Sequence, residues 1–92
     1  MNRDQRLERA EELPFSRLEN QLLVVVAKTR EVHLLNESAA RIWDLLETPE
    51  SLGSLMEALG EEFDLDPGTA EKEVEAAVSE MIGKGLVRAL PA

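Results

Sequence analysis

The sequence contains no cysteine and no tyrosine, and its 92 residues include one histidine and one tryptophan. Without cysteine, the chain has no disulfides and no thiolate metal ligands. With a single imidazole, the nucleophile–base pairs that many enzymes use are nearly absent. That imidazole, His33, alternates with Glu31 along a predicted strand, so we expect a solvated side chain. We therefore assign no catalytic residue and expect that the chain is not an enzyme.

Long apolar runs are absent as well. No run approaches the roughly 18 residues that a helix needs to span a bilayer, and the segment Met1-Asn2-Arg3-Asp4 does not resemble the start of a signal peptide. These features, with the lack of cysteine, favour a cytoplasmic location. The hydrophobic fraction of 43% is ordinary for a globular protein and too high for intrinsic disorder. A chain of this length forms one small domain.

Basic residues are scarce in the second half of the chain. Residues 1–41 hold seven basic and seven acidic side chains, whereas residues 42–92 hold three basic and twelve acidic ones, which accounts for the whole net charge of −9. Phosphate backbones and anionic membranes repel such a surface, so we expect neither nucleic acid nor a membrane as a partner. The charge permits a basic partner without requiring one, because a charge excess is most often a solvated surface.

Acidic residues cluster around Asp64, but their spacing does not match a cation site. A calcium loop that started there would need glycine at its sixth position, where Thr69 stands. Gly83-Lys84-Gly85 is too short for a phosphate-binding loop and follows no predicted strand. We therefore expect no metal site and no cofactor.

The first half of the chain predicts strands. Residues 1–12 are mostly charged and polar, and we interpret them as a flexible or weakly helical tail before a single domain at 13–92. Pro14–Leu18 predicts a short edge strand, Gln21–Ala27 a buried strand and Glu31–Leu35 a third strand with alternating polarity. The short connections predict an antiparallel meander.

A helical pattern begins directly after the third strand, where Asn36 is a good N-cap. Thr48-Pro49-Glu50 ends this helix, and Ser51 is positioned to cap a second one. Asp66-Pro67 starts a third helix, and Gly85 is the glycine expected just after its end. Apolar residues recur at helical spacing in all three, at Ala39, Ile42, Trp43 and Leu46, at Leu52, Leu55, Met56, Leu59 and Phe63, and at Ala70, Val74, Ala77, Val78, Met81 and Ile82.

These elements, with a short final strand at 86–90, predict an α+β fold. A three-stranded antiparallel sheet at the N-terminus precedes a three-helix, winged helix-turn-helix-like unit. That architecture usually lays one helix in the major groove of DNA. Here the corresponding helix, residues 67–84, carries four Glu and two Lys, and its net charge of −2 opposes contact with phosphates. A winged-helix transcriptional regulator that acts on DNA or through dimers is the alternative to the function considered next.

The exposed edge of the predicted sheet favours a different function. An edge strand presents unpaired N–H and C=O groups, with which an extended peptide can pair. If the third strand lies at the edge beside the third helix, a groove forms between them. Many small sheets have edges that bind nothing, so the edge alone does not establish peptide capture.

The run Leu34-Leu35-Asn36-Glu37-Ser38-Ala39-Ala40 with Ile42-Trp43 is the most distinctive part of the chain. With the positions that follow it, this run resembles the PqqD-like proteins, which are also described as RiPP recognition elements. The run is fairly specific, whereas the later positions are mostly general helix patterning. The resemblance covers roughly residues 14–90. The later matching positions are Leu55 and Leu59, then Phe63-Asp64-Leu65-Asp66, then Val74 and Val78, and finally Gly85-Leu86-Val87.

The resemblance implies a function without catalysis. Members of this family bind the leader segment of a ribosomally made precursor peptide and present it to a modifying enzyme, often a radical SAM protein. The leader adds as a strand beside the third strand and packs on the third helix, while Asn36 and Trp43 are expected to serve as a cap and a core anchor. The expected peptide-binding residues are Glu31, Val32, His33, Leu34, Leu35, Glu71, Val74, Glu75, Val78, Met81 and Lys84.

Two features depart from the family pattern. Many members have an Asp-Gly turn after the first helix, where this chain has Thr48-Pro49-Glu50, and residues 1–12 have no clear counterpart. Neither departure identifies the pathway, so assembly of pyrroloquinoline quinone (PQQ) is one of several that fit. The same exposed edge can also pair two copies, which leaves the oligomeric state open.

Overall fold

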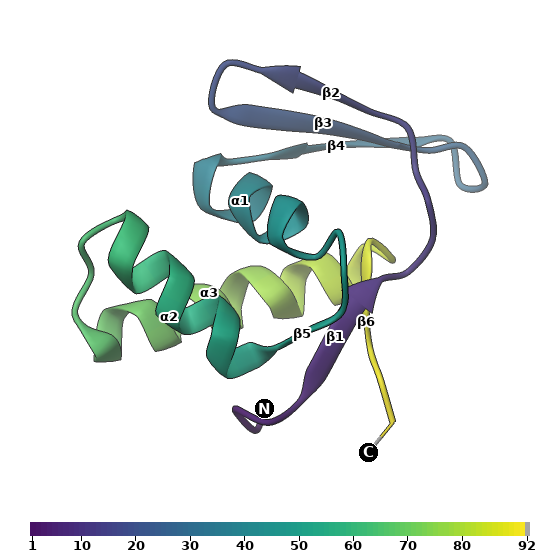
Figure 1. Cartoon of the computed structure of the whole chain (residues 1–92). Helices are drawn as coiled ribbons and strands as arrows, with labels where there is room; N and C mark the ends of the chain where they lie inside the picture. The colour runs from purple at the N-terminus through teal and green to yellow at the C-terminus, as the bar shows by residue number, and fades with distance from the viewer. Residues whose placement is uncertain (92) are drawn as a thin grey trace.

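The computed structural model describes residues 1–91, in which a three-stranded sheet covers α1 and the other two helices lie beyond it (Figure 1). A second small sheet joins the two ends of the chain to the segment before α2. The α+β prediction is confirmed. The elements are β1 (Arg6–Arg9), β2 (Phe15–Leu18), β3 (Gln21–Val26), β4 (Glu31–Leu35), α1 (Glu37–Leu45), β5 (Glu50–Ser51), α2 (Leu52–Glu62), α3 (Pro67–Gly83) and β6 (Val87–Ala89).

The larger sheet is the predicted antiparallel meander in the order β2-β3-β4. Its register places Leu22 opposite Leu35 and Val25 opposite Val32. Every second residue of β3, beginning with Leu22, is buried against α1, as the period of two along a strand requires. β4 ends the sheet on one side, so its outer edge has no strand partner among the described residues.

The smaller sheet, in the order β5-β1-β6, overturns one expectation. Residues 1–12 were expected to be a flexible or weakly helical tail, but Arg6–Arg9 form the central strand of this sheet. Leu7 is completely buried, while the residues beside it are wholly or partly exposed. One apolar side chain flanked by charged ones is too short a pattern to predict a strand from local sequence. Its pairing partners lie more than 40 residues away.

Each helix begins at the cap that the sequence predicts. The Asn36 side chain accepts a hydrogen bond from the N–H of Ala39 at 3.0 Å, so β4 passes into α1 with no loop between them. Ser51 caps α2 in the same way, and Asp66 caps α3 directly before Pro67. The hydrogen bond from the Thr69 backbone lowers the pKa of the Asp66 carboxyl. The chain leaves α3 through Gly85, whose φ of 76° suits glycine.

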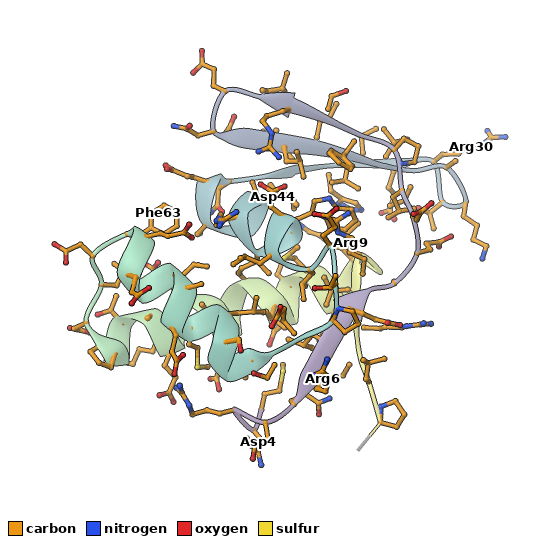
Figure 2. All side chains as sticks on the ribbon, in the orientation of Figure 1. Asp4, Arg6, Arg9, Arg30, Asp44 and Phe63 are labelled. Carbon is orange, nitrogen blue, oxygen red and sulfur yellow. The ribbon has the colours of Figure 1, made fainter. Side chains whose placement is uncertain are left out.

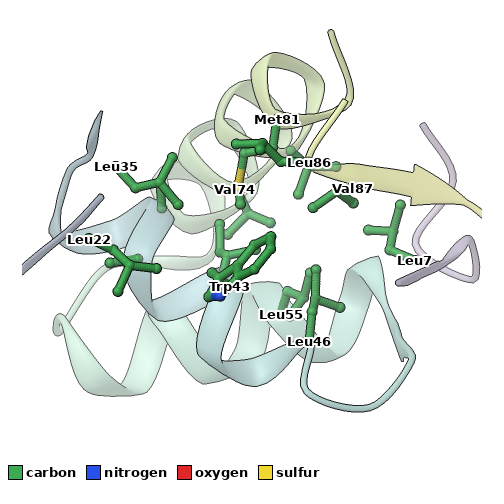
Figure 3. Packing of buried hydrophobic residues seen from close by; sticks show 14 of the residues in the cluster. Leu7, Leu22, Leu35, Trp43, Leu46, Leu55, Val74, Met81, Leu86 and Val87 are labelled. Atoms are coloured by element: carbon green, nitrogen blue, oxygen red, sulfur yellow. The ribbon is translucent and has the colours of Figure 1, made fainter. Parts of the chain in front are cut away.

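The core lies where the three helices meet both sheets, and Trp43 is completely buried at its centre (Figure 3). The Arg9 guanidinium lies over the Trp43 ring at 4.4 Å and donates hydrogen bonds to the Trp43 carbonyl oxygen. Figure 2 shows Arg9 between β1 and the larger sheet. Phe15 of β2 packs edge-on against the same ring with a centroid distance of 6.1 Å. Trp43 therefore links α1, both sheets and the N-terminal strand.

The buried position of Leu7 yields a test of the N-terminal strand. We expect Leu7→Ala to lower the free energy of unfolding by about 2–5 kcal/mol, because it leaves a cavity in the core. Leu18→Ala is the matched control, since Leu18 is 48% exposed and its loss should cost less than about 0.5 kcal/mol. Urea unfolding followed by circular dichroism measures both values. Equal stability of the two variants would mean that residues 6–9 do not pack as described.

Candidate functional site: the groove between β4 and α3

A groove of about 370 Å³ runs between the end of β4 and one face of α3. One wall comes from the strand-to-helix junction and the other from α3. Because Asn36 lets β4 enter α1 directly, the last residues of the strand lie at the mouth of the groove. The first wall consists of Leu34, Leu35, Asn36, Ser38 and Ala39, and the second of Glu73, Ala76, Ala77, Glu80, Met81 and Lys84.

The orientation of the β3 backbone decides which groups of β4 face the groove. The Val25 N–H donates a hydrogen bond to the Pro14 carbonyl at 2.9 Å, so the Val25 backbone turns toward β2. Successive residues of a strand turn their N–H and C=O groups to opposite sides. Val24 therefore turns toward β4, where the register places His33 opposite it.

The free edge of β4 follows from this pairing. Because His33 exchanges its backbone hydrogen bonds with β3, its neighbours Val32 and Leu34 turn their N–H and C=O groups outward. No backbone hydrogen bond within residues 1–91 reaches either residue from outside the sheet. Their side chains are also 56% and 51% exposed. Two residues thus present four unpaired backbone groups along the free edge of β4, and Leu34 places two of these groups at the groove.

The wall on α3 is a single helical stripe. Glu73, Ala76, Ala77, Glu80 and Lys84 stand at positions i, i+3, i+4, i+7 and i+11, which share one face of a helix. The two alanines give this stripe a low, apolar centre, while carboxylates stand on both sides of it. The groove therefore combines a backbone edge, an apolar floor and an acidic rim.

The charges on the rim are not equivalent. The Lys84 ammonium donates a hydrogen bond to the Glu80 carboxylate at 2.8 Å. This hydrogen bond and the positive charge of Lys84 lower the pKa of Glu80, which favours the ionised carboxylate. Glu73 forms no ion pair with any residue of the described chain. The Glu73 carboxylate is thus the charge on this wall that is open to an external cation.

The structure corrects part of the expected site on α3. Val74 and Val78 were expected to contact a peptide, but both side chains are completely buried in the core. Met81 is 1% exposed and forms the base of the groove. Glu71 and Glu75 lie outside the groove lining, and Glu75 instead faces the N-terminal amine at 3.9 Å. Of the predicted α3 residues, Met81 and Lys84 line the groove.

The expected strand residues divide between the two faces of the sheet. Val32 and Leu34 lie on the exposed face, whereas Leu35 is buried. His33 was expected to be solvated, but its side chain is 12% exposed, because it shares the inner face with Leu35. Its Nε2 lies 3.8 Å from a carboxylate oxygen of Glu31. The side chains of His33 and Leu35 therefore pack on the inner face of the sheet and do not lie on its exposed face.

Sequence reasoning missed the residues that form most of the α3 wall, namely Glu73, Ala76, Ala77 and Glu80 as groove residues. The missing information was the phase of the helix. Ala70, Val74, Val78 and Met81 form the buried stripe, so the groove lies on the neighbouring stripe. A helical wheel of α3 would show the groove residues beside the core stripe, provided that the core stripe is first identified within the apolar face.

A second hollow, of about 500 Å³, lies between α2 and α3 and away from β4. The N-terminal segment reaches it, because the Arg3 guanidinium lies 3.2 Å from the Met56 sulfur and 3.8 Å from the Glu57 carboxylate. None of its lining residues belongs to a strand. Within residues 1–91, no group of three His, Cys, Asp or Glu side chains is arranged to hold a metal ion. In the same residues, no helix has the length and apolar character needed to cross a membrane.

Comparisons with known proteins agree with this architecture. Residues 21–87 match the family described as Coenzyme PQQ synthesis protein D (PqqD), and the chain belongs to the PqqD family. A solved structure described as TbiB1 in complex with the TbiA(beta) leader peptide has the same fold, with a TM-score of 0.79 and 18% sequence identity. The alignment covers 92% of this chain and 99% of that one. A search of curated proteins gives no match.

The derived orientation of β4 can be tested by amide hydrogen exchange. We expect the His33 N–H to exchange at least about tenfold more slowly than the N–H groups of Val32 and Leu34, because it pairs with β3. Exchange measured by NMR at low protein concentration resolves the three amides. Slow exchange of Val32 and Leu34 would show that this edge is covered, and a dependence on protein concentration would identify a second copy as the cover.

Proposed function

We propose that this chain is a non-catalytic module that captures the leader segment of a ribosomally made precursor peptide. The leader adds as a strand to the free edge of β4, and its inward side chains enter the groove against α3. The observation that carries this proposal is the pair of outward-facing residues on the free edge of β4, Val32 and Leu34, of which Leu34 lines that groove. Membership of the PqqD family and the shared fold with a leader-bound protein support it.

The proposed role extends to a partner enzyme. A module that holds a peptide as an added strand leaves the residues beyond that strand free for another protein to modify. We propose that the partner is a separate modifying enzyme, such as a radical SAM protein, and that both act in the cytoplasm, where the precursor is made. PQQ assembly and other peptide-modification pathways both fit this role.

Strand addition alone gives weak binding. Each backbone hydrogen bond contributes about 1 kcal/mol net, so four bonds at Val32 and Leu34 contribute about 4 kcal/mol, which corresponds to a Kd of about 1 mM. Burial of one large apolar side chain adds about 1.5–3 kcal/mol. Micromolar affinity therefore requires that leader side chains also use the groove.

No feature of residues 1–91 favours DNA binding. The exposed surface of α3 carries Glu71, Glu73 and Glu80, which oppose contact with phosphates. A gel-shift measurement with upstream DNA should accompany the peptide assay. Salt-sensitive DNA binding with a Kd below about one micromolar would support the alternative of a winged-helix transcriptional regulator.

The proposal predicts binding to a leader from the chain's own gene neighbourhood. Synthetic leaders from precursor genes beside this one should bind with micromolar Kd in calorimetric titrations. Absence of binding to all of them at tens of micromolar would contradict the proposal. A short precursor gene and a radical SAM gene nearby would support it and would identify the pathway.

Proline substitutions test the edge itself. We expect Leu34→Pro to weaken leader binding at least about tenfold, because it removes an outward N–H and disturbs strand geometry. Val32→Pro should act in the same direction. Arg17→Pro is the matched control, since Arg17 lies on the opposite edge strand of the same sheet.

All three variants must keep the far-ultraviolet circular dichroism spectrum and a cooperative unfolding transition. Unchanged affinity in folded Leu34→Pro and Val32→Pro would exclude this edge. Loss of affinity in Arg17→Pro alone would place the peptide on β2 instead.

A further inference from the structure

We propose that the groove selects a basic peptide. Its preferred ligand is an extended segment in which a bulky apolar residue and a Lys or Arg stand two positions apart and face α3. This inference rests on the proposed function, since it specifies the peptide that the same groove binds.

The spacing of two follows from strand addition. In a strand added to β4, residues opposite His33 and Leu35 turn to the inner face, where α3 lies, and the residues between them turn to solvent. Alternate side chains on one face of a strand stand about 6.6 Å apart. Neighbouring inward side chains of the peptide can therefore reach different parts of the α3 wall.

The centre of that wall suits a bulky apolar side chain. Ala76 and Ala77 of α3 and Ala39 of α1 contribute one methyl group each, and the buried Met81 closes the base. Short side chains on both sides keep the groove open. Burying a large apolar side chain there strengthens binding up to about a hundredfold, which raises a millimolar strand contact to micromolar affinity.

Glu73 supplies the preference for a basic residue. It stands three and four residues before the two alanines, which is about 4.5–6 Å along the helix axis. This separation is close to one two-residue step of an extended peptide. In the view of Figure 1, α3 and β4 lie roughly along the same line and run in opposite directions, so steps along the helix can be compared with steps along an added strand. A Lys or Arg beside the apolar anchor thus meets an unpaired carboxylate, whereas an acidic residue there is repelled.

The rest of the chain favours the same sign. Glu80 already has Lys84 as its partner, and residues 42–92 carry all of the net charge of −9. This field raises the association rate of a basic peptide, an effect that salt reduces. A general field does not depend on position, however, so variants at matched sites can separate it from a specific contact at Glu73.

The test begins with short random peptides displayed on phage and selected against the purified chain. We expect enrichment of a bulky apolar residue two positions from Lys or Arg. The best peptide is then synthesised, together with a version in which that basic residue is Glu. Fluorescence anisotropy should show about two- to fivefold weaker binding of the acidic version, the size expected for one exposed ion pair and its reversal.

Glu73→Lys and Glu71→Lys separate the specific contact from the general field. Both change the net charge equally and lie on the same helix, but Glu71 is outside the groove. We expect Glu73→Lys to reverse the preference between the two peptides and Glu71→Lys to keep it. Ala76→Met should weaken binding of the apolar anchor, whereas Ser79→Met, which lies outside the groove lining, should not.

The outcomes distinguish the two proposals. Enriched peptides that lack a basic residue, or equal effects of Glu73→Lys and Glu71→Lys, would overturn the selectivity while leaving peptide capture intact. Failure of all selected peptides and natural leaders to bind would overturn peptide capture, and the selectivity with it.

Discussion

The direct passage from β4 into α1 determines the position of every other part of the site. Asn36 ends the strand, and its side chain accepts a hydrogen bond from the N–H of Ala39 in the first turn of α1, so no flexible residue separates the two elements. Leu35 before the cap and Ala39 after it are both buried, which holds the junction against the core. With its inner face held in this way, β4 keeps a fixed free edge beside α3. A longer connection would let the edge of β4 move relative to α3, and the groove between them would then have no fixed shape.

The N-terminal strand contributes to the same arrangement from the opposite side of the core. β1 pairs with both β5 and β6, so it connects the segment after α1 with the segment after α3. Arg9 extends this connection, because its guanidinium packs on the Trp43 ring and binds the Trp43 carbonyl. The helices α1 and α3 both contribute to the walls of the groove, and β1 pairs with the strand that follows each of them. The charged residues at the N-terminus therefore stabilise the relative position of α1 and α3, although they lie outside the region matched by the family.

Local sequence patterns predicted most helices and strands, whereas the features that were not predicted depend on contacts between residues distant in sequence. The meander, the three caps and the buried Trp43 all follow from periodicity and capping chemistry within a few residues, and the structure confirms them. β1 could not be predicted in this way, since its pairing partners are distant in sequence. The α3 wall was missed for a related reason. Which stripe of an amphipathic helix faces the core depends on the elements packed against it, so Val74 and Val78 were assigned to a groove when they belong to the core.

The free edge and the exposed face of the larger sheet create a risk of aggregation. Val32 and Leu34 combine unpaired backbone groups with exposed aliphatic side chains, and the register places Leu23 and Val25 beside them on the same face. Such an edge is a template for aggregation, which proteins usually block with lysine, proline or a bulge. β4 has none of these devices along Val32–Leu34. The net charge of −9 opposes self-association at long range, yet the same charge attracts a basic strand. In the proposed role, a net negative charge that disfavours a second copy at this edge and favours a basic peptide takes the place of a local block.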